Sequence, residues 1–89
     1  MFAEILYVES LKDYIRIHLE SGTVVTKESI SAFEQMLPRH FLRVHRSFIV
    51  NTQKITAFTT QDVEIGPKEI PIGGSYRQQV GKFLTKDKF

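Results

Sequence analysis

Basic side chains are concentrated in the middle of this 89-residue sequence, over a stretch that lacks acidic ones. Residues 35–61 contain no aspartate or glutamate, although the formal net charge of the whole chain is only +2. The basic residues of this stretch are Arg39, Arg43, Arg46 and Lys54. A local positive field attracts phosphate even when the net charge is small. The stretch therefore indicates either a nucleic-acid partner or an ordinary basic surface without one.

The residue types that catalysis needs are poorly represented. His45 and Ser47 are two positions apart and would share one face of a strand, where an imidazole can activate a hydroxyl. No acidic residue lies nearby in the sequence to orient the imidazole, and Ser47 lacks the glycine-flanked turn of a hydrolase nucleophile. We therefore predict that the protein is not an enzyme.

Metal and cofactor sites are not expected either. The three histidines, His18, His40 and His45, lack the spacing of metal ligands, and the chain has no cysteine. Residues 73–75, Gly-Gly-Ser, match only a fragment of a nucleotide-binding loop, so a strand-to-helix turn is the favoured interpretation. We expect no metal, no cofactor and no small-molecule substrate.

Length and composition fit one small domain. The chain is too short for a second hydrophobic core, and 42% hydrophobic with 25% charged residues is ordinary for a globular protein. It contains neither a signal peptide nor an apolar run of the ~20 residues that span a bilayer. The lack of cysteine fits a reducing compartment, and we expect a soluble, cytoplasmic domain.

The first third of the chain predicts antiparallel strands. Residues 5–8 form a continuous apolar run that is short enough for a buried strand. Residues 14–20 alternate between apolar and polar side chains, the period of a half-buried strand. Ser21-Gly22 indicates a hairpin turn into a β-branched strand over residues 23–26.

Two short helices are predicted. The first begins after Ser29 as N-cap and ends before Pro38, and its apolar side consists of Ile30, Phe33 and Leu37. The second covers residues 76–84, with Ser75 and Gln78 as a capping box.

Residues 41–51 contain a charge that a flat strand could not accommodate. The apolar face of this segment consists of Leu42, Val44, Phe48 and Val50. Arg46 falls on the same face, where an unpaired guanidinium would be very costly to bury. We therefore predict a bend over residues 45–47 between two strands, which places Arg46 at an exposed tip.

The last third predicts short strands and turns. Strands are expected over 55–60 and 63–65, a turn over 66–68, and a further strand over 69–72. This last strand belongs at a sheet edge because Pro71 has no backbone N–H. The predicted fold class is mostly β, with small antiparallel sheets and one or two short helices.

Three blocks of the sequence resemble the LytTR-type DNA-binding domain of bacterial response regulators. They are Ile5-Leu6-Tyr7-Val8-Glu9-Ser10, Phe41-Leu42-Arg43-Val44-His45-Arg46-Ser47-Phe48-Ile49-Val50-Asn51, and Ile70-Pro71-Ile72-Gly73. The middle block is close to the family's signature, and the resemblance covers nearly the whole chain. It implies an elongated arrangement of small antiparallel sheets with a short helix between them.

The resemblance also implies that three loops, rather than a recognition helix, enter the major groove of DNA. The first surrounds Lys12, Asp13 and Tyr14, and the second places a base-reading side chain at Arg46. In the third, the family's long polar or basic side chain falls on Gly74, which has none. Either fewer bases are read, or a neighbouring side chain of the third loop takes over.

Candidate DNA contacts follow from this resemblance together with the charge pattern. The base-reading candidates are Arg46, Lys12, Tyr14 and Arg77, and arginine suits bidentate contact with guanine. The DNA-backbone candidates are Arg39, Arg43, His45, Ser47, Asn51, Lys54, Ser75 and Lys82. Several of the basic residues could instead be solvated surface charges. His45 and Asn51 could equally bond backbone groups and hold the shape of the loop.

The family usually has a short strand or hairpin before the first block, whereas here only four residues precede it. We expect residues 1–89 to be a single domain, excised from a longer regulator and lacking that first strand or hairpin. A sheet edge would then be open, and such an edge can pair with another copy.

The function implied is sequence-specific binding of duplex DNA, as the output domain of a bacterial two-component transcription regulator. A second copy on the DNA and an upstream receiver or input domain are the expected partners. The alternative is a protein-interaction module, or a degenerate member of the family that binds nucleic acid without sequence preference.

Overall fold

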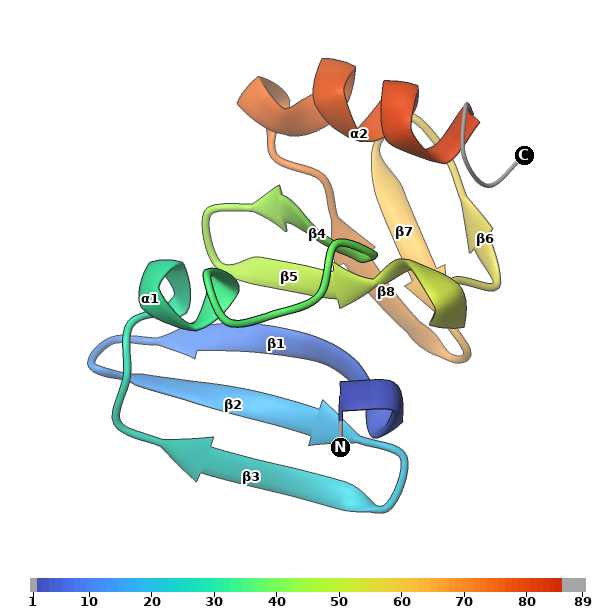
Figure 1. The fold of residues 1–89 in the computed structure, drawn as a ribbon. Coiled ribbons are helices and arrows are strands. Elements are labelled where there is room, and N and C mark those ends of the chain that lie inside the picture. Colours follow the sequence, from blue (N-terminus) through green and yellow to red (C-terminus); the bar gives the residue numbers. More distant parts are fainter. Residues whose placement is uncertain (1, 86–89) are drawn as a thin grey trace.

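Short apolar runs and alternating residues build a five-stranded antiparallel sheet with the order β3-β2-β1-β5-β4 (Figure 1). The structure is a computed structural model that describes residues 2–85. The strands of this sheet are β1 (Ile5–Leu11), β2 (Tyr14–Leu19), β3 (Gly22–Thr26), β4 (Phe41–His45) and β5 (Phe48–Asn51). The strands predicted in the first third of the chain are therefore confirmed, as is the bend that separates β4 from β5.

The turn between β2 and β3 lies one residue earlier than predicted. Leu19 pairs with Gly22, so that Glu20 and Ser21 form the turn and Gly22 begins β3. The φ angle of Gly22 is 151°, a backbone conformation that side chains disfavour and glycine adopts freely.

The remaining strands form a small antiparallel sheet in the order β6-β7-β8. They are β6 (Ala57–Phe58), β7 (Asp62–Ile65) and β8 (Lys68–Pro71). β8 lies at the edge, as predicted from Pro71. The 3-10 helix η2 (Thr52–Lys54) precedes this sheet. The predicted strand over 55–60 is wrong in its extent, because only Ala57 and Phe58 pair with β7 and the chain turns at Thr59, whose Oγ1 accepts hydrogen bonds from the backbone N–H groups of Gln61 and Asp62.

The first helix is confirmed with its predicted cap. In α1 (Ile30–Glu34), the Oγ of Ser29 accepts a hydrogen bond of 3.0 Å from the backbone N–H of Ala32. The helix is shorter than its apolar pattern, so Leu37 lies beyond its end and still packs against the same core.

The second helix is α2 (Arg77–Phe83), and the predicted capping box is wrong. Ser75 lies inside the 3-10 helix η3 (Gly74–Tyr76), and the N-cap of α2 is Tyr76, which makes no side-chain capping bond. A third 3-10 helix, η1 (Phe2–Glu4), precedes β1. No helix within residues 2–85 is long and apolar enough to cross a membrane.

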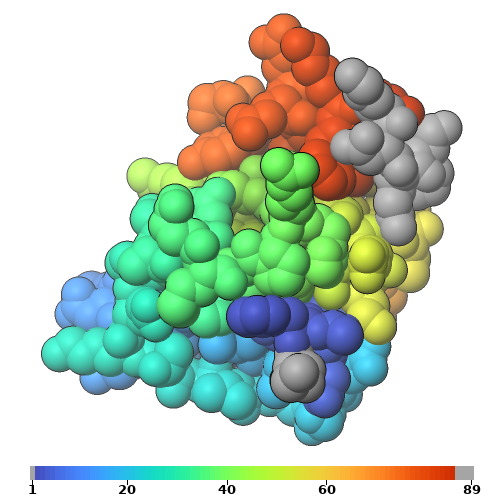
Figure 2. Space-filling view, viewed as in Figure 1, coloured from blue at the N-terminus to red at the C-terminus, as the bar shows by residue number. Residues whose placement is uncertain are grey.

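The five-stranded sheet is covered on both faces. One core contains Val8, Ile49 and the apolar side of α1, and the other contains Tyr7, Val50 and residues of the second sheet and α2. Figure 2 shows how these parts are stacked: β1–β3 lie at the bottom, the segment from α1 to β5 lies in the middle, and α2 lies at the top. Packing on both faces holds the two sheets and both helices in one unit of 33 × 26 × 22 Å.

The expected open edge is not at the start of the chain. β1 is hydrogen-bonded to β2 on one side and to β5 on the other. The exposed edge is β3, where Val24 and Val25 are both about half exposed.

Asn51 is a structural residue rather than a DNA contact. Its side chain is fully buried, and its Nδ2 donates a hydrogen bond of 2.8 Å to the backbone oxygen of Ile5. Its Oδ1 accepts a hydrogen bond of 3.0 Å from the backbone N–H of Gln53, which begins η2 and ends β5. The prediction that Asn51 contacts the DNA backbone is therefore wrong, because burial removes the side chain from any external ligand.

We expect Asn51→Ala to lower the free energy of unfolding by about 1–3 kcal/mol, because it leaves a buried backbone carbonyl without its partner. Urea denaturation followed by circular dichroism measures this change. Gln53→Ala is the matched control, because the Gln53 side chain is exposed and only its backbone takes part in the cap. Equal stability of the two variants would contradict the structural role of Asn51.

Candidate nucleic-acid interface

Three turns meet at the end of the sheet where β1 ends and β5 begins, on the left in Figure 1. They comprise residues 12–14, 45–47 and 72–77, and we call them together the loop edge. The backbone N–H of Ser10, near the end of β1, donates to the oxygen of Ser47 (2.9 Å) in the second turn. The backbone N–H of Gly73, in the third turn, donates to the oxygen of Val44 (2.8 Å) in β4, just before the second turn.

Arg46 projects from the middle turn of the loop edge. It lies between β4 and β5 and is exposed. This is the bend predicted from the cost of burying a guanidinium on the apolar face of the segment. Within residues 2–85, its guanidinium forms neither an ion pair nor a hydrogen bond; only its backbone oxygen is bonded. Its side chain is therefore free to bind an external acceptor.

Arg43 points into the same turn and is fully engaged there. Its Nε donates to the backbone oxygen of His45 (2.8 Å), and its Nη2 donates to the backbone oxygen of Arg46 (2.6 Å). Its Nη1 forms an ion pair of 2.7 Å with Glu34 at the end of α1. With its side chain only 14% exposed, Arg43 supports the turn from inside the domain and is not presented as a phosphate contact.

His45 and Ser47 shape the same turn. The Nδ1 of His45 accepts a hydrogen bond of 3.0 Å from the backbone N–H of Ser47, which assigns the proton of the neutral ring to Nε2. The ring packs edge-on against Phe48, with centroids 5.5 Å apart. His45 therefore bonds a backbone group and holds the shape of the turn, which is the alternative given above to a DNA contact. The hydrogen bond from Ser47 occupies its Nδ1 atom.

The first turn presents two exposed candidates. Lys12 has a φ angle of 48°, so the chain reverses tightly between β1 and β2. Tyr14 is 46% exposed, at the start of β2. A shallow depression runs from Lys12 to residues 27–29, which places the N-terminal side of α1 next to this turn.

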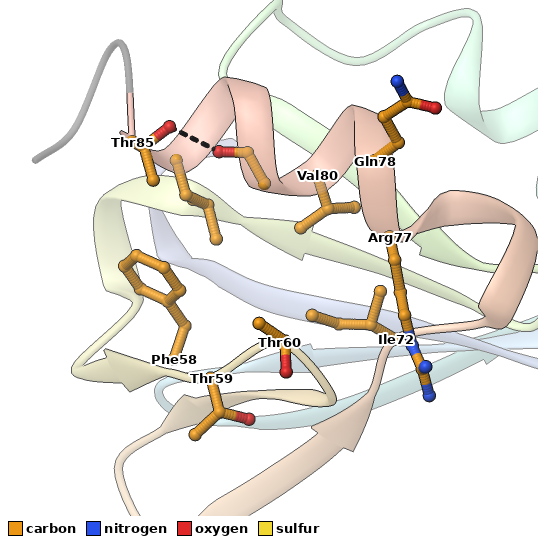
Figure 3. Close-up of a pocket in the computed structure, with 10 residues that line it drawn as sticks. Phe58, Thr59, Thr60, Ile72, Arg77, Gln78, Val80 and Thr85 are labelled. Carbon is orange, nitrogen blue, oxygen red and sulfur yellow. Dashed lines mark hydrogen bonds between the residues drawn. The ribbon is translucent and has the colours of Figure 1, made fainter.

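The third turn brings further polar side chains to the loop edge. Arg77 extends from the first turn of α2 past Ile72, while Gln78 points to the other side of the helix (Figure 3). Ser75 and Lys82 are exposed and line one shallow depression together with residues 78 and 79. Lys12, Arg77 and Lys82 form no ion pair with any described residue.

The acidic side chain of Glu9, near the end of β1, is paired inside the domain, whereas Asp13 in the first turn is exposed. Glu9 lies 3.1 Å from the Nε2 of His18 and 3.6 Å from the guanidinium of Arg16. His18 in turn stacks on Tyr7 with ring centroids 4.1 Å apart. Burial raises the pKa of the Tyr7 phenol, and the carboxylate of Glu9 acts in the same direction. These pairs offset the charge of Glu9, and Asp13 is the acidic residue that the first turn presents to solvent.

Two candidates lie away from the loop edge. Arg39 precedes β4 and Lys54 follows β5, and these strand ends pair with each other at the opposite end of the hairpin. Lys54 also forms an ion pair of 2.6 Å with Glu20 in the β2–β3 turn. The structure therefore does not bring Arg39 or Lys54 together with Arg46.

An apolar pocket of ≈ 480 Å³ lies beneath α2 (Figure 3). Its described lining includes Phe58, Ile72, Val80 and Leu84, with Arg77 and three threonines, and contains no histidine or carboxylate. Within residues 2–85, no group of three or more metal-ligating side chains is found. The loop edge presents the exposed side chains of Lys12, Tyr14, Arg46, Ser75 and Arg77.

The fold is a small β-domain of two antiparallel sheets, and the loop edge carries the exposed basic side chains of Lys12, Arg46 and Arg77. A sequence profile of the LytTr DNA-binding domain matches residues 1–85, and the protein belongs to this family. This confirms the family that the three sequence blocks indicated, and a DNA-binding domain is consistent with the prediction that the chain is not an enzyme.

A solved structure supports the same assignment. The chain is similar to the LytTr DNA-binding domain of a methyl-accepting/DNA response regulator from Bacillus cereus. The TM-score is 0.83 with 31% identical residues, over 93% of this chain and 83% of that one. A comparison with curated proteins gave no match. The similarity confirms the mostly β fold class.

We expect Gly73→Val to lower the free energy of unfolding by about 1–3 kcal/mol through overpacking. A Cβ atom at Gly73 would lie 3.0 Å from the ring of Tyr76 and 3.6 Å from the Cα of His45, so that a branched side chain forces the second and third turns apart. Thermal unfolding checks this. Gly74→Val is the matched control, because a Cβ at Gly74 meets no atom within 4 Å. A similar loss in both variants would mean that close approach at Gly73 is not the cause.

Proposed function

We propose that this domain binds duplex DNA sequence-specifically by inserting the loop edge into the major groove. The observation that carries the proposal is the free guanidinium of Arg46 at the exposed tip of the middle turn. The strand β1 that leads into the first turn is hydrogen-bonded to the middle turn, and the third turn is hydrogen-bonded to β4 just before the middle turn. Loops fixed by backbone hydrogen bonds hold a side chain in one direction, as base reading requires.

Arg46 is the base-reading residue of this proposal. An arginine donates two parallel hydrogen bonds to the O6 and N7 atoms of guanine, a pattern that no other base presents in the major groove. Among the candidates on the middle turn, Arg43 and His45 are engaged with the backbone. Arg46 is the long donor on that turn that remains available.

The outer turns supply the other candidate contacts to the duplex. Lys12 and Tyr14, exposed at the first turn, and Arg77, exposed at the third, are the further base-reading candidates. We assign Ser75 and Lys82, which share a depression on α2, to the phosphate backbone. Arg77 extends beside the third turn and takes the place of the side chain that Gly74 lacks.

We further propose that the domain is the output module of a bacterial two-component transcription regulator that acts in the cytoplasm. The response-regulator origin of the similar Bacillus cereus domain supports this context. A longest dimension of 33 Å covers about one turn of duplex, ~34 Å, so a second copy would read a longer, repeated site. An upstream receiver or other input domain would control that pairing.

Selection from a random duplex library tests the base-reading role. We expect the parent domain to enrich a short motif, and Arg46→Ala to weaken that site by ~1–3 kcal/mol and relax one base pair. Lys54→Ala is the matched control at the opposite end of the hairpin, and its preference and salt slope should equal those of the parent.

Enrichment of no motif by the parent would contradict specific binding. Duplex binding without preference would support the degenerate member of the family, and no duplex binding would support the protein-interaction module. A motif that survives Arg46→Ala unchanged would remove Arg46 from base reading.

We expect Gly74→Arg to raise duplex affinity, because a side chain there enters open space beside the loop edge. The added charge should also increase the slope of log affinity against log salt by about one unit. Gln53→Arg, an equal change of charge on η2 away from the loop edge, is the control and should change neither quantity as much. Loss of affinity in a folded Gly74→Arg domain would mean that the glycine backbone itself approaches DNA.

A further inference from the structure

The backbone on both sides of the Arg46 Cα is held by a single side chain. The oxygen of His45 belongs to the peptide plane before Arg46, and the oxygen of Arg46 belongs to the plane after it. Arg43 donates to both, at 2.8 and 2.6 Å. Because peptide units are planar, fixing the two planes fixes the φ and ψ angles of Arg46 and hence the direction of its Cα–Cβ bond.

We propose that Arg43 is a positioning residue for Arg46, and that Glu34 of α1 in turn orients Arg43. This inference rests on the proposed function, in which Arg46 reads a base. Base preference then depends on a chain of contacts that runs from α1 through Glu34 and Arg43 to the tip of the turn. Arg43 contributes to recognition without contacting DNA.

Only arginine can perform this role. Its planar guanidinium carries donors on three nitrogen atoms in fixed directions, and here each nitrogen has a different acceptor. A lysine ammonium is a point charge on a flexible stem and does not reproduce the same fork of donors. Arg43→Lys therefore keeps the charge of the turn while it removes the constraint on the peptide planes.

Glu34 connects the turn to the core. It is the last residue of α1, whose Ile30 and Phe33 are buried in the core beneath the sheet. Its carboxylate pairs with Arg43 at 2.7 Å and neutralises the guanidinium that is bonded to the backbone oxygen of Arg46. Glu34→Gln keeps the size of the side chain, weakens its hold on Arg43 and leaves that positive charge uncompensated.

The experiment compares affinities for the selected duplex and for a scrambled duplex of equal length. For Arg43→Lys we expect the preference for the selected duplex to fall about tenfold, within the range of one lost base contact. Its affinity for the scrambled duplex should stay within about twofold of the parent, because the charge is kept. For Glu34→Gln the preference should also fall, while affinity for the scrambled duplex rises.

Amide hydrogen exchange provides a readout that is independent of DNA. In both variants the N–H of Ser47, which bonds to His45, should exchange faster, while core amides such as that of Val8 keep their protection. Arg39→Lys makes the same chemical change at an exposed arginine away from the loop edge and should alter neither exchange nor preference.

Two results would overturn the inference. Unchanged preference and unchanged Ser47 exchange in Arg43→Lys would show that the constraint is not needed. A lower affinity for the scrambled duplex, together with a smaller salt slope, would make Arg43 a phosphate contact instead. If the parent itself shows no preference, the proposed function fails, and the exchange measurement still decides whether Arg43 holds the turn.

Discussion

Burial of β1 and β5 on both faces is the constraint on which the rest of the structure depends. Val8, Ile49 and Val50 are fully buried, although neighbouring residues along a strand point to opposite faces. Each aliphatic side chain buried in this way contributes about 1.5–3 kcal/mol. A guanidinium could therefore enter neither face without a partner, and the chain has to leave the sheet at Arg46. The exposed position of Arg46 at the tip of the middle turn is therefore a consequence of how the core is packed.

The loop edge follows from strand pairing. Because β1 and β5 are antiparallel neighbours, the end of β1 and the start of β5 lie side by side, and the β1–β2 turn meets the β4–β5 turn there. The second sheet adds the third turn through the hydrogen bond from Gly73 to Val44. The loop edge is thus assembled from segments far apart in the sequence, which are held by backbone hydrogen bonds.

Sequence reasoning succeeds where one local rule decides the outcome. The alternation over β2, the Ser29 cap and the position of Arg46 each follow from periodicity or from the cost of burying charge. It fails where tertiary contacts decide. The expected strand over 55–60 is shortened because only Ala57 and Phe58 are paired with β7. The 3-10 helix η2 that precedes it begins at the cap of Asn51, whose buried side chain is also bonded to Ile5. Likewise, no sequence rule places Arg43 on Glu34, nine positions away on another element.

The acid-free stretch illustrates the same limit for charge. As a sequence feature, it suggests that Arg39, Arg46 and Lys54 form one basic surface. The β4–β5 hairpin separates them, because residues that flank a hairpin gather at one end and turn residues at the other. At the open end Lys54 is neutralised by Glu20, and at the turn Arg43 is neutralised by Glu34. What remains at the turn is a single free guanidinium, and an isolated donor in a fixed position suits discrimination between bases better than a diffuse positive field does.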